Sequence, residues 1–294
     1  MSIFVRFWGT RGSIPTPGSK TRRYGGNTSC VEIDAAGHLV ILDAGTGLRE
    51  LGHALQSRSE GRVEAHLFFS HTHWDHIQGF PFFVPAYQPS SKLHVYEIAR
   101  HEERFTRLLL GQMRSEYFPV TFADLGASIL PKYFESNRVA LGSITIRCLE
   151  QTHPGRSFAY RLECEGKSVV YATDSELDLL LLDREQTLSD LERMRELPSA
   201  VTAFVEGADL LIADAQYTDE EYPKKIGWGH SRVGTVVDLA VRANVKRLAL
   251  FHHDPMHSDD RVEAIVEMAQ KRALARRSAL DVFAAREDLV LKVG

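Results

Sequence analysis

The feature that most constrains this chain is the run His71-Thr72-His73-Trp74-Asp75-His76, which directly follows an apolar segment. The preceding residues 65–70 are rich in aromatic and apolar side chains, a pattern that predicts a short buried strand. Gly79 and Pro81 come soon afterwards, so the strand should end where the histidines begin. Imidazoles and a carboxylate are therefore concentrated at the end of one strand.

Side chains of this kind at this density are typical of a metal site. His71 and His73 point the same way on an extended chain, whereas Asp75 and His76 follow the turn and can face the same point from another side. Zinc, iron and manganese accept such ligands in catalytic sites. The alternative is a polar surface turn that happens to hold histidines, but buried imidazoles need a partner. We therefore predict a metal centre here.

The motif His-x-His-x-Asp-His resembles the signature of the metallo-β-lactamase superfamily. The resemblance implies an α/β fold, an αββα sandwich of two mixed β-sheets flanked by helices, with a two-metal site at one edge. We expect one hydrolase domain over residues 1–294, because no low-complexity linker or repeat divides the chain. One fold hosts many chemistries, so the motif alone does not name a substrate.

Later strand ends carry the same kinds of residue. His153 follows a predicted strand at 144–150, Asp174 ends a predicted hairpin, and His252 follows a predicted strand at 247–251. A lone polar residue after a strand is ordinarily a cap or turn residue, but the recurrence favours one shared site. The resemblance implies that one metal ion is held by His71, His73 and His153, the other by Asp75, His76 and His252, and that Asp174 bridges them.

Two neighbouring positions bear on this ligand set. His252 and His253 point in opposite directions on an extended chain, so only one should ligate. The apolar run over 248–251 favours His252, and the role of His253 stays open. Asp43, at the end of a predicted strand over 38–43, is expected to orient a ligating histidine, with a helix cap as the alternative. We expect two divalent ions, zinc or alternatively manganese.

A further polar pair is expected to handle protons. Asp214 ends a predicted buried strand at 209–214, and His230 precedes a helix with apolar periodicity at Val233, Val236 and Val237. By resemblance to the RNase Z branch of the superfamily, His230 protonates the leaving group and Asp214 holds its other nitrogen. Asp75 would orient the attacking nucleophile or take its proton. A plain helix cap at His230 is the alternative.

Candidate substrate contacts come from loops. The loop over 9–29 opens with Gly-Thr-Arg-Gly-Ser-Ile-Pro-Thr, similar to the opening of RNase Z-like proteins. Asn27 and Thr28 could donate to an anion, although a solvated surface connection is an equal alternative for this loop. Trp228 is a candidate to stack on a base, as are Phe82 and Tyr217, whose alternative is packing in the core.

The interval between His153 and Asp174 bears on the substrate. RNase Z carries a long flexible arm that grips transfer RNA, inserted in the best-known forms at this point, but here one predicted hairpin fills the interval. We therefore predict a metal-dependent phosphodiesterase that hydrolyses 3′,5′-cyclic nucleotides to nucleoside monophosphates. The alternatives are an RNase Z-like RNA endonuclease without the arm, and a metal-binding module without catalysis.

Composition supports a small substrate. The net charge of −4 argues against a large polyanionic partner, so we expect a small phosphodiester rather than a nucleic acid.

No apolar stretch approaches the ~18 residues of a membrane span, and no signal peptide is visible. Cys30, Cys148 and Cys164 form no Cys-x-x-Cys pair, and we expect reduced thiols in a cytoplasmic protein. The oligomeric state stays open, with a homodimer as one alternative.

Overall fold

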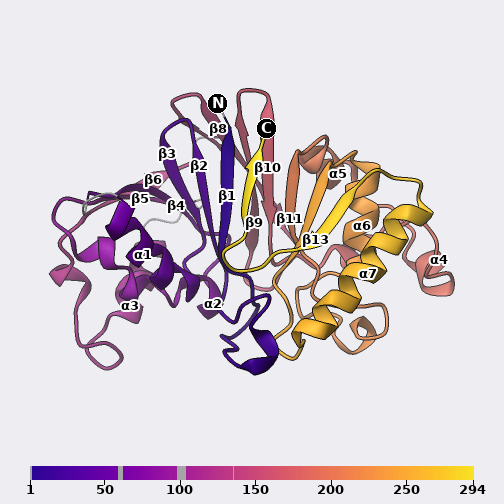
Figure 1. Ribbon diagram of the computed structural model, residues 1–294, viewed down its shortest axis with the longest axis horizontal. Coiled ribbons are helices and arrows are strands. Elements are labelled where there is room, and N and C mark those ends of the chain that lie inside the picture. Colours follow the sequence, from indigo (N-terminus) through magenta and orange to yellow (C-terminus); the bar gives the residue numbers. More distant parts are fainter. Residues whose placement is uncertain (1, 59–61, 98–103, 135) are drawn as a thin grey trace.

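Two β-sheets packed face to face, with helices on the outer face of each, make up the structure (Figure 1). This computed structural model describes residues 2–58, 62–97, 104–134 and 136–294. Both sheets are mixed, so the predicted αββα sandwich of the α/β class is confirmed. Among the described helices, none is both long and apolar enough to cross a membrane.

The first sheet comes from the N-terminal half of the chain, with one strand added from the C-terminus. Its neighbours are antiparallel for the first four strands and parallel from β3 onward. In spatial order it contains β14 (Val290–Val293), β1 (Ile3–Gly9), β2 (Cys30–Ala35), β3 (His38–Leu42), β4 (Glu64–Phe68), β5 (Lys92–Glu97) and β6 (Ser128–Tyr133). Its helices are α1 (Gly47–Arg58), α2 (Trp74–Ile77) and α3 (Arg104–Gln112).

The second sheet repeats this scheme, with parallel pairs from β13 to β10 and antiparallel pairs from β10 to β7. In spatial order it contains β13 (Asp281–Ala284), β12 (Arg247–Phe251), β11 (Leu210–Asp214), β10 (Lys167–Ala172), β9 (Ser157–Cys164), β8 (Ile144–Gln151) and β7 (Arg138–Leu141). Its helices are η5 (Leu177–Leu180), α4 (Arg184–Ser189), α5 (Ser199–Val205), α6 (Val233–Arg242) and α7 (Asp259–Ala275).

Most predicted elements form within one or two residues of their expected bounds. The hairpin between β2 and β3 turns at Ala36 and Gly37, both with positive φ, as a tight two-residue turn requires. Strand β7 is not among the predicted elements, and helix α3 is described from Arg104 onward. Helix α6 begins at Val233, so His230 lies in the loop before it and is not its cap.

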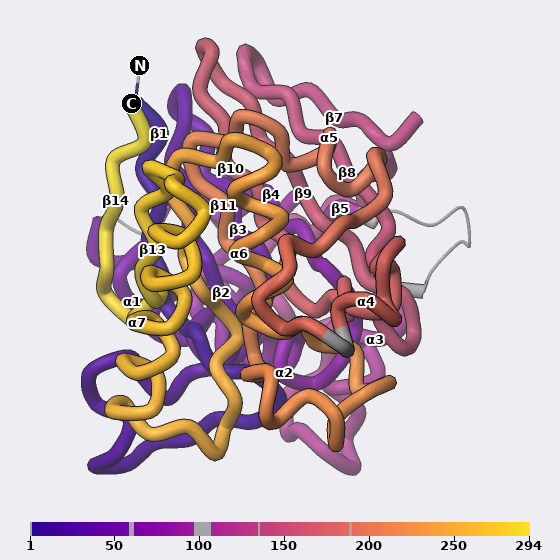
Figure 2. Tube along the Cα trace, turned by 90° about the vertical axis from the view of Figure 1, so that its right-hand side faces the viewer, coloured from indigo at the N-terminus to yellow at the C-terminus, as the bar shows by residue number. Residues whose placement is uncertain are grey.

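The chain directions gather several strand ends at one edge of the sandwich. Strands β3 and β4 are parallel, β10 to β12 are parallel, and β8 runs in the same direction as β10 because β9 lies antiparallel between them. Helix α2 lies at this edge, and the N- and C-termini lie at the opposite one (Figures 1 and 2). The residues that follow these strands are therefore brought together.

A core between the sheets holds this edge in place. Phe68 on β4 is fully buried, stacks on Tyr96 of the same sheet at 4.1 Å between ring centroids, and meets Tyr160 of the other sheet at 5.6 Å. Aromatic pairs add to the stabilisation that buried apolar area gives. Phe68 lies in the strand that leads directly to His71, so its packing also places the metal motif.

Replacing Phe68 by alanine should lower the free energy of unfolding by about 3–5 kcal/mol, because a large cavity would open between the sheets. Chemical denaturation of the metal-free protein measures this. The matched control is Phe4→Ala, since Phe4 lies on β1 with 45% of its surface exposed. Equal losses from both variants would contradict the role assigned to the inter-sheet core.

Candidate active site

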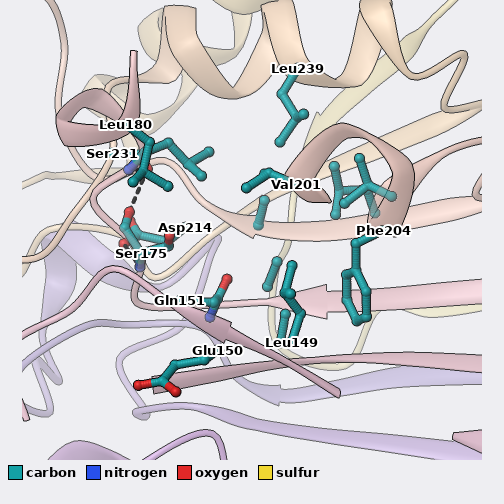
Figure 3. Close-up of a pocket in the computed structure, with 16 residues that line it drawn as sticks. Leu149, Glu150, Gln151, Ser175, Leu180, Val201, Phe204, Asp214, Ser231 and Leu239 are labelled. Atoms are coloured by element: carbon teal, nitrogen blue, oxygen red, sulfur yellow. Dashed lines mark hydrogen bonds between the residues drawn. The ribbon is translucent and has the colours of Figure 1, made fainter. Parts of the chain in front are cut away.

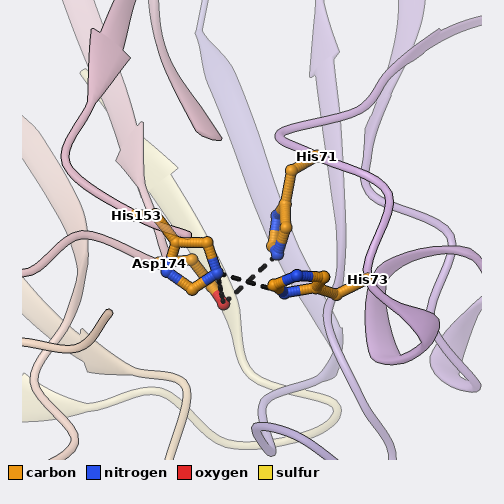
Figure 4. A group of neighbouring side chains, drawn as sticks. All are labelled: His71, His73, His153 and Asp174. Atoms are coloured by element: carbon orange, nitrogen blue, oxygen red, sulfur yellow. Dashed lines mark hydrogen bonds and ion pairs between the residues drawn. The ribbon is translucent and has the colours of Figure 1, made fainter. Parts of the chain in front are cut away.

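All the predicted metal ligands converge at this edge of the sandwich, in two groups. Within each group, one ligand atom from every residue lies within 4.8 Å of the others. Asp174 belongs to both groups. The first group, shown in Figure 4, contains His71, His73, His153 and Asp174, and the second contains Asp75, His76, His252 and Asp174.

The carboxylate of Asp174 divides its oxygens between the groups. Oδ2 lies 3.5 Å from His71 Nε2 and 3.8 Å from His153 Nε2. Oδ1 lies 3.2 Å from the Nε2 atoms of both His76 and His252. Asp174 thus presents one oxygen to each group, an arrangement compatible with a bridging role, and that role stays a prediction.

Unusual backbone conformations aim three of these side chains. Asp43, Asp174 and His252 each follow a strand and have φ values of 61°, 49° and 58°. This left-handed region costs roughly 1–3 kcal/mol for a residue other than glycine, and such residues cluster at functional sites. The chain turns sharply off each strand there and directs the side chain into the space between the sheets' ends.

Hydrogen bonds at Nδ1 orient three of the histidines in these groups. His76 Nδ1 donates to Asp43 Oδ2 at 2.8 Å, and His153 Nδ1 donates to the carbonyl of Gly229 at 2.8 Å. His71 Nδ1 lies 3.0 Å from Ser70 Oγ, whose own proton goes to Asp43. These partners leave each Nε2 facing the centre, the arrangement that metal-bound histidines require.

Asp43 accepts several of the hydrogen bonds that surround the histidines. Besides His76, its carboxylate accepts bonds from the backbone N–H of Ser70 at 2.7 Å and from the Tyr171 hydroxyl at 2.7 Å. Asp43 is buried, so these donors compensate for the loss of water around its charge. The structure places Asp43 against His76 as predicted, and Ser70 and Tyr171 complete the contact.

The charge balance of the cluster fits metal ions. Burial lowers the pKa of the His71 imidazole well below its ordinary value, and nearby His76 adds to this. Burial also opposes a charge on His76, but Asp174 and Asp75 outweigh it and raise the pKa of His76 well above the ordinary value. His71 Nε2 is buried without a hydrogen-bond partner. Divalent ions in the two groups would pair this nitrogen and offset the carboxylates.

His230 and Asp214 form a couple beside the metal groups. His230 Nδ1 donates to Asp214 Oδ2 at 2.8 Å, and the His230 ring lies 5.0 Å from the His252 ring. Burial opposes a charge on His230, but Asp214 overcomes this and raises the pKa of His230 to about 9. The couple therefore has the predicted geometry, with the far side of the imidazole facing the cluster.

Asp214, which accepts the hydrogen bond from His230, also lines a small cavity (Figure 3). Its volume is about 40 Å³, and most of its wall is apolar, including Leu180, Val201 and Leu239. The Ser231 hydroxyl donates to the carbonyl of Ser175 at the polar end. The apolar wall limits the water that could compete with His230 for the Asp214 carboxylate.

The N-terminal loop contacts the site through its backbone. The N–H of Ser13 donates to Asp75 Oδ2 at 2.7 Å. A Cβ on Gly12 would lie 2.5 Å from the His252 ring, so only glycine fits this close approach. The guanidinium of Arg11 is fully buried and donates to the carbonyls of Gly25 and His257. The opening motif therefore fastens this loop onto the site.

The predicted substrate contacts need correction. Thr28 is fully buried and exchanges hydrogen bonds with Thr46, so its side chain belongs to the scaffold. Asn27 is held by Glu287 through both its backbone and its side chain. Tyr217 is only 3% exposed and cannot offer a face to a base. Trp228 is 58% exposed beside the site and stays a candidate.

His253 has a role apart from the metals. Its Nε2 donates to the carbonyl of Ala285 at 2.9 Å, and burial lowers the pKa of His253 to about 3. Its backbone N–H donates to the carbonyl of Thr10, while the Gly12 N–H donates to the His253 carbonyl. His253 therefore ties the N-terminal loop to the second sheet while His252 faces the centre.

Glu176 is a residue that the sequence interpretation missed. Its buried carboxylate accepts bonds from the Tyr222 hydroxyl at 2.7 Å and from the backbone N–H groups of Gly227 and Gly229 at 2.8 Å each. These bonds fix the loop that leads to His230. The only signal in the sequence is the position of Glu176 just after Asp174.

Comparison with known proteins identifies the family. A model of the β-lactamase superfamily domain matches residues 38–253, which include every ligand of both metal groups. Ribonuclease Z of Natronomonas pharaonis is 27% identical, over 88% of this chain and 90% of its own. Ribonuclease Z of Methanosarcina acetivorans is 26% identical, over 91% of this chain and 92% of its own.

Solved structures agree on the fold. A metallo-β-lactamase fold protein of Bacillus subtilis superposes with a TM-score of 0.70 at 19% identity, covering 99% of both chains. The short form of human tRNase Z superposes with a TM-score of 0.65 at 17% identity, again covering 99% of both chains. At these identities the likeness extends to the architecture, and it agrees with the two-sheet sandwich described above.

The purified chain should hold two divalent ions per protomer, as measured by elemental analysis after extensive dialysis. Asp174→Ala should reduce the content of both ions because Asp174 contributes to both groups. His73→Ala should mainly affect one. The matched control is His53→Ala on the exposed face of α1, which should keep the full content. A fully loaded protein with at most one ion would contradict the two-metal assignment.

Proposed function

This chain belongs to the β-lactamase superfamily, and from that premise we propose that it is a metal-dependent phosphodiesterase that cleaves RNA. The observation that carries the proposal is the pair of ligand groups that share Asp174, with the His230–Asp214 couple beside them. The two groups would hold two metal ions, and we propose zinc. Bound metals would supply Lewis acidity and a water of lowered pKa at neutral pH.

Support for an RNA substrate comes from the relatives. The proteins of Natronomonas, Methanosarcina and several other organisms that match nearly the whole chain are named Ribonuclease Z. They favour the RNA-directed alternative over the cyclic-nucleotide prediction, which none of the comparisons supports. The loop that leads to His230 carries Lys224 and Lys225, which follow the acidic run Asp219-Glu220-Glu221.

One observation keeps cyclic nucleotides as a second candidate. Between His153 and Asp174 the chain forms only the hairpin of β9 and β10. An arm for gripping a folded transfer RNA has no place in this interval. We therefore expect short single-stranded RNA to be a better substrate than a folded precursor, and a small cyclic diester stays the competing possibility.

The chain's own residues would divide the work of hydrolysis. Asp75 is held by the Ser13 N–H and is positioned to orient the attacking water or to take its proton. His230, whose Nδ1–H donates to Asp214, is positioned to give a proton to the leaving alkoxide. The Gly229 carbonyl fixes the orientation of His153, and Glu176 fixes Gly229, so the loop that carries His230 is attached to the metal groups.

His230→Ala should lower kcat by roughly 10²–10⁴ while the metal content stays unchanged, because the loss would be of proton transfer and not of a ligand. The activity of the variant on a nitrophenyl phosphodiester, whose leaving group needs no proton, should fall less than its activity on an RNA dinucleotide. Elemental analysis and steady-state rates on both substrates measure this, with His53→Ala as the control. Equal losses on both substrates would remove His230 from the acid role.

The substrate is decided by a panel assayed with zinc and with manganese. The panel contains an RNA dinucleotide, a single-stranded RNA hexamer, a transfer RNA precursor and 3′,5′-cyclic nucleotides. We expect the highest kcat/KM on the linear single strands. Hydrolysis of cyclic nucleotides with the linear RNAs left intact would restore the cyclic-nucleotide prediction. Loaded protein that is inactive on every substrate would indicate a module without catalysis.

A further inference from the structure

Two exposed tryptophans lie directly beside the metal groups. Trp74 is 67% exposed and Trp228 is 58% exposed, whereas the third tryptophan of the chain, Trp8, is buried. Single exposed apolar residues are common on protein surfaces. Two exposed indoles next to one site are a different matter, because tryptophan is the side chain that gains most from being covered.

Each tryptophan is connected, directly or through one hydrogen bond, to one of two imidazoles that face each other. Trp74 directly follows His73 in the chain. Trp228 directly precedes Gly229, whose carbonyl accepts the Nδ1–H bond of His153 at 2.8 Å. His73 Nδ1 and His153 Nε2 lie 3.1 Å apart. Each tryptophan therefore adjoins one imidazole of this pair, Trp74 along the chain in the first sheet's motif and Trp228 through the hydrogen-bonded loop of the second sheet.

Both tryptophans are held on rigid backbone. Trp74 begins α2, whose next residues, Asp75 and His76, are part of the second metal group. The residues on either side of Trp228, Gly227 and Gly229, donate their N–H groups to opposite oxygens of the buried Glu176 carboxylate. An exposed aromatic on a fixed backbone loses little entropy when a ligand covers it.

The surroundings of Trp228 add a positive charge. Lys225 Nζ lies 3.8 Å from the centre of the Trp228 ring, a cation–π contact. The backbone N–H of Trp228 donates to the Lys225 carbonyl at 3.0 Å, so the two residues share one turn. The ammonium group lies over one face of the indole, so a nucleobase would stack on the opposite face while the positive charge attracts a neighbouring phosphate.

We propose that Trp74 and Trp228 each stack on a base, one on either side of the bond that is cleaved, so that the preferred substrate is single-stranded RNA with an intact base at both positions. This inference rests on the proposed function and names the substrate class for the same site. Bases in a duplex are already stacked and paired, so an unpaired strand is required. A cyclic mononucleotide could engage only one of the two indoles.

The test combines truncation of each tryptophan with removal of each base. With a dinucleotide substrate, Trp74→Ala and Trp228→Ala should each raise KM about 5- to 150-fold with little change in kcat, as the loss of one stacked base predicts. Trp→Phe at either position should retain most of the binding. With a dinucleotide that lacks the base on one side, one of the two alanine substitutions should no longer raise KM. With a dinucleotide that lacks the opposite base, the other substitution should no longer raise KM.

Controls separate this inference from the proposed function. Tyr133→Ala removes an aromatic of β6 that is 55% exposed, and it should leave KM unchanged. If RNA is cleaved but neither tryptophan variant changes KM, the inference is wrong and the proposed function stands. Equal effects of both variants on intact and abasic substrates would also overturn the inference, because the tryptophans would then act through the fold.

Fluorescence gives a readout that does not depend on turnover. Trp74→Phe and Trp228→Phe each leave one exposed indole and the buried Trp8, whose Nε1 donates to Glu32 at 2.7 Å. An RNA hexamer added to the metal-loaded protein should quench each remaining exposed indole. If RNA is not cleaved, quenching in both variants would support the inference while the proposed function fails. An absence of quenching in both would overturn the inference.

Discussion

The buried carboxylate of Asp174 is the interaction on which the rest of this site depends. One oxygen faces His71 and His153 and the other faces His76 and His252, so a single side chain joins both ligand groups. A charge buried this deeply is stable only beside opposite charge. Metal ions would satisfy that requirement and would also pair the buried nitrogen of His71. Much of the surrounding hydrogen bonding serves to keep these imidazoles aimed at the centre.

The convergence of the candidate ligands could be predicted from the sequence because much of its signal is local. A strand pattern followed by His71-Thr72-His73-Trp74-Asp75-His76 specifies both the place and the direction of the side chains. His153, Asp174 and His252 could be added because each follows a strand, and strands with the same direction end at the same edge. The choice of His252 over His253 also followed from alternation along the strand, and the structure places only His252 among the metal groups.

What the sequence did not predict depends on long-range backbone contacts. Glu176 holds N–H groups of a loop about fifty positions away, and no local pattern marks it as an acceptor. Asn27 and Thr28 looked like donors in a glycine-rich loop, but their partners, Glu287 and Thr46, lie in distant segments. The backbone N–H of Ser13 contacts Asp75 instead. The type of a residue predicts a metal-binding side chain well. It does not predict which distant backbone group will lie in contact with that side chain.

Each ligand group contains residues from both sheets, so metal binding would be coupled to folding. The motif after β4 belongs to the first sheet, whereas His153, Asp174 and His252 follow strands of the second. Neither sheet alone can complete a group, so the site exists only when the sheets are packed. Any free energy gained when metal binds the folded state therefore adds to the stability of the inter-sheet core. The strained backbone at Asp174 and His252 is held by the packing of the sheets, and metal ligation would act in the same direction against its relaxation.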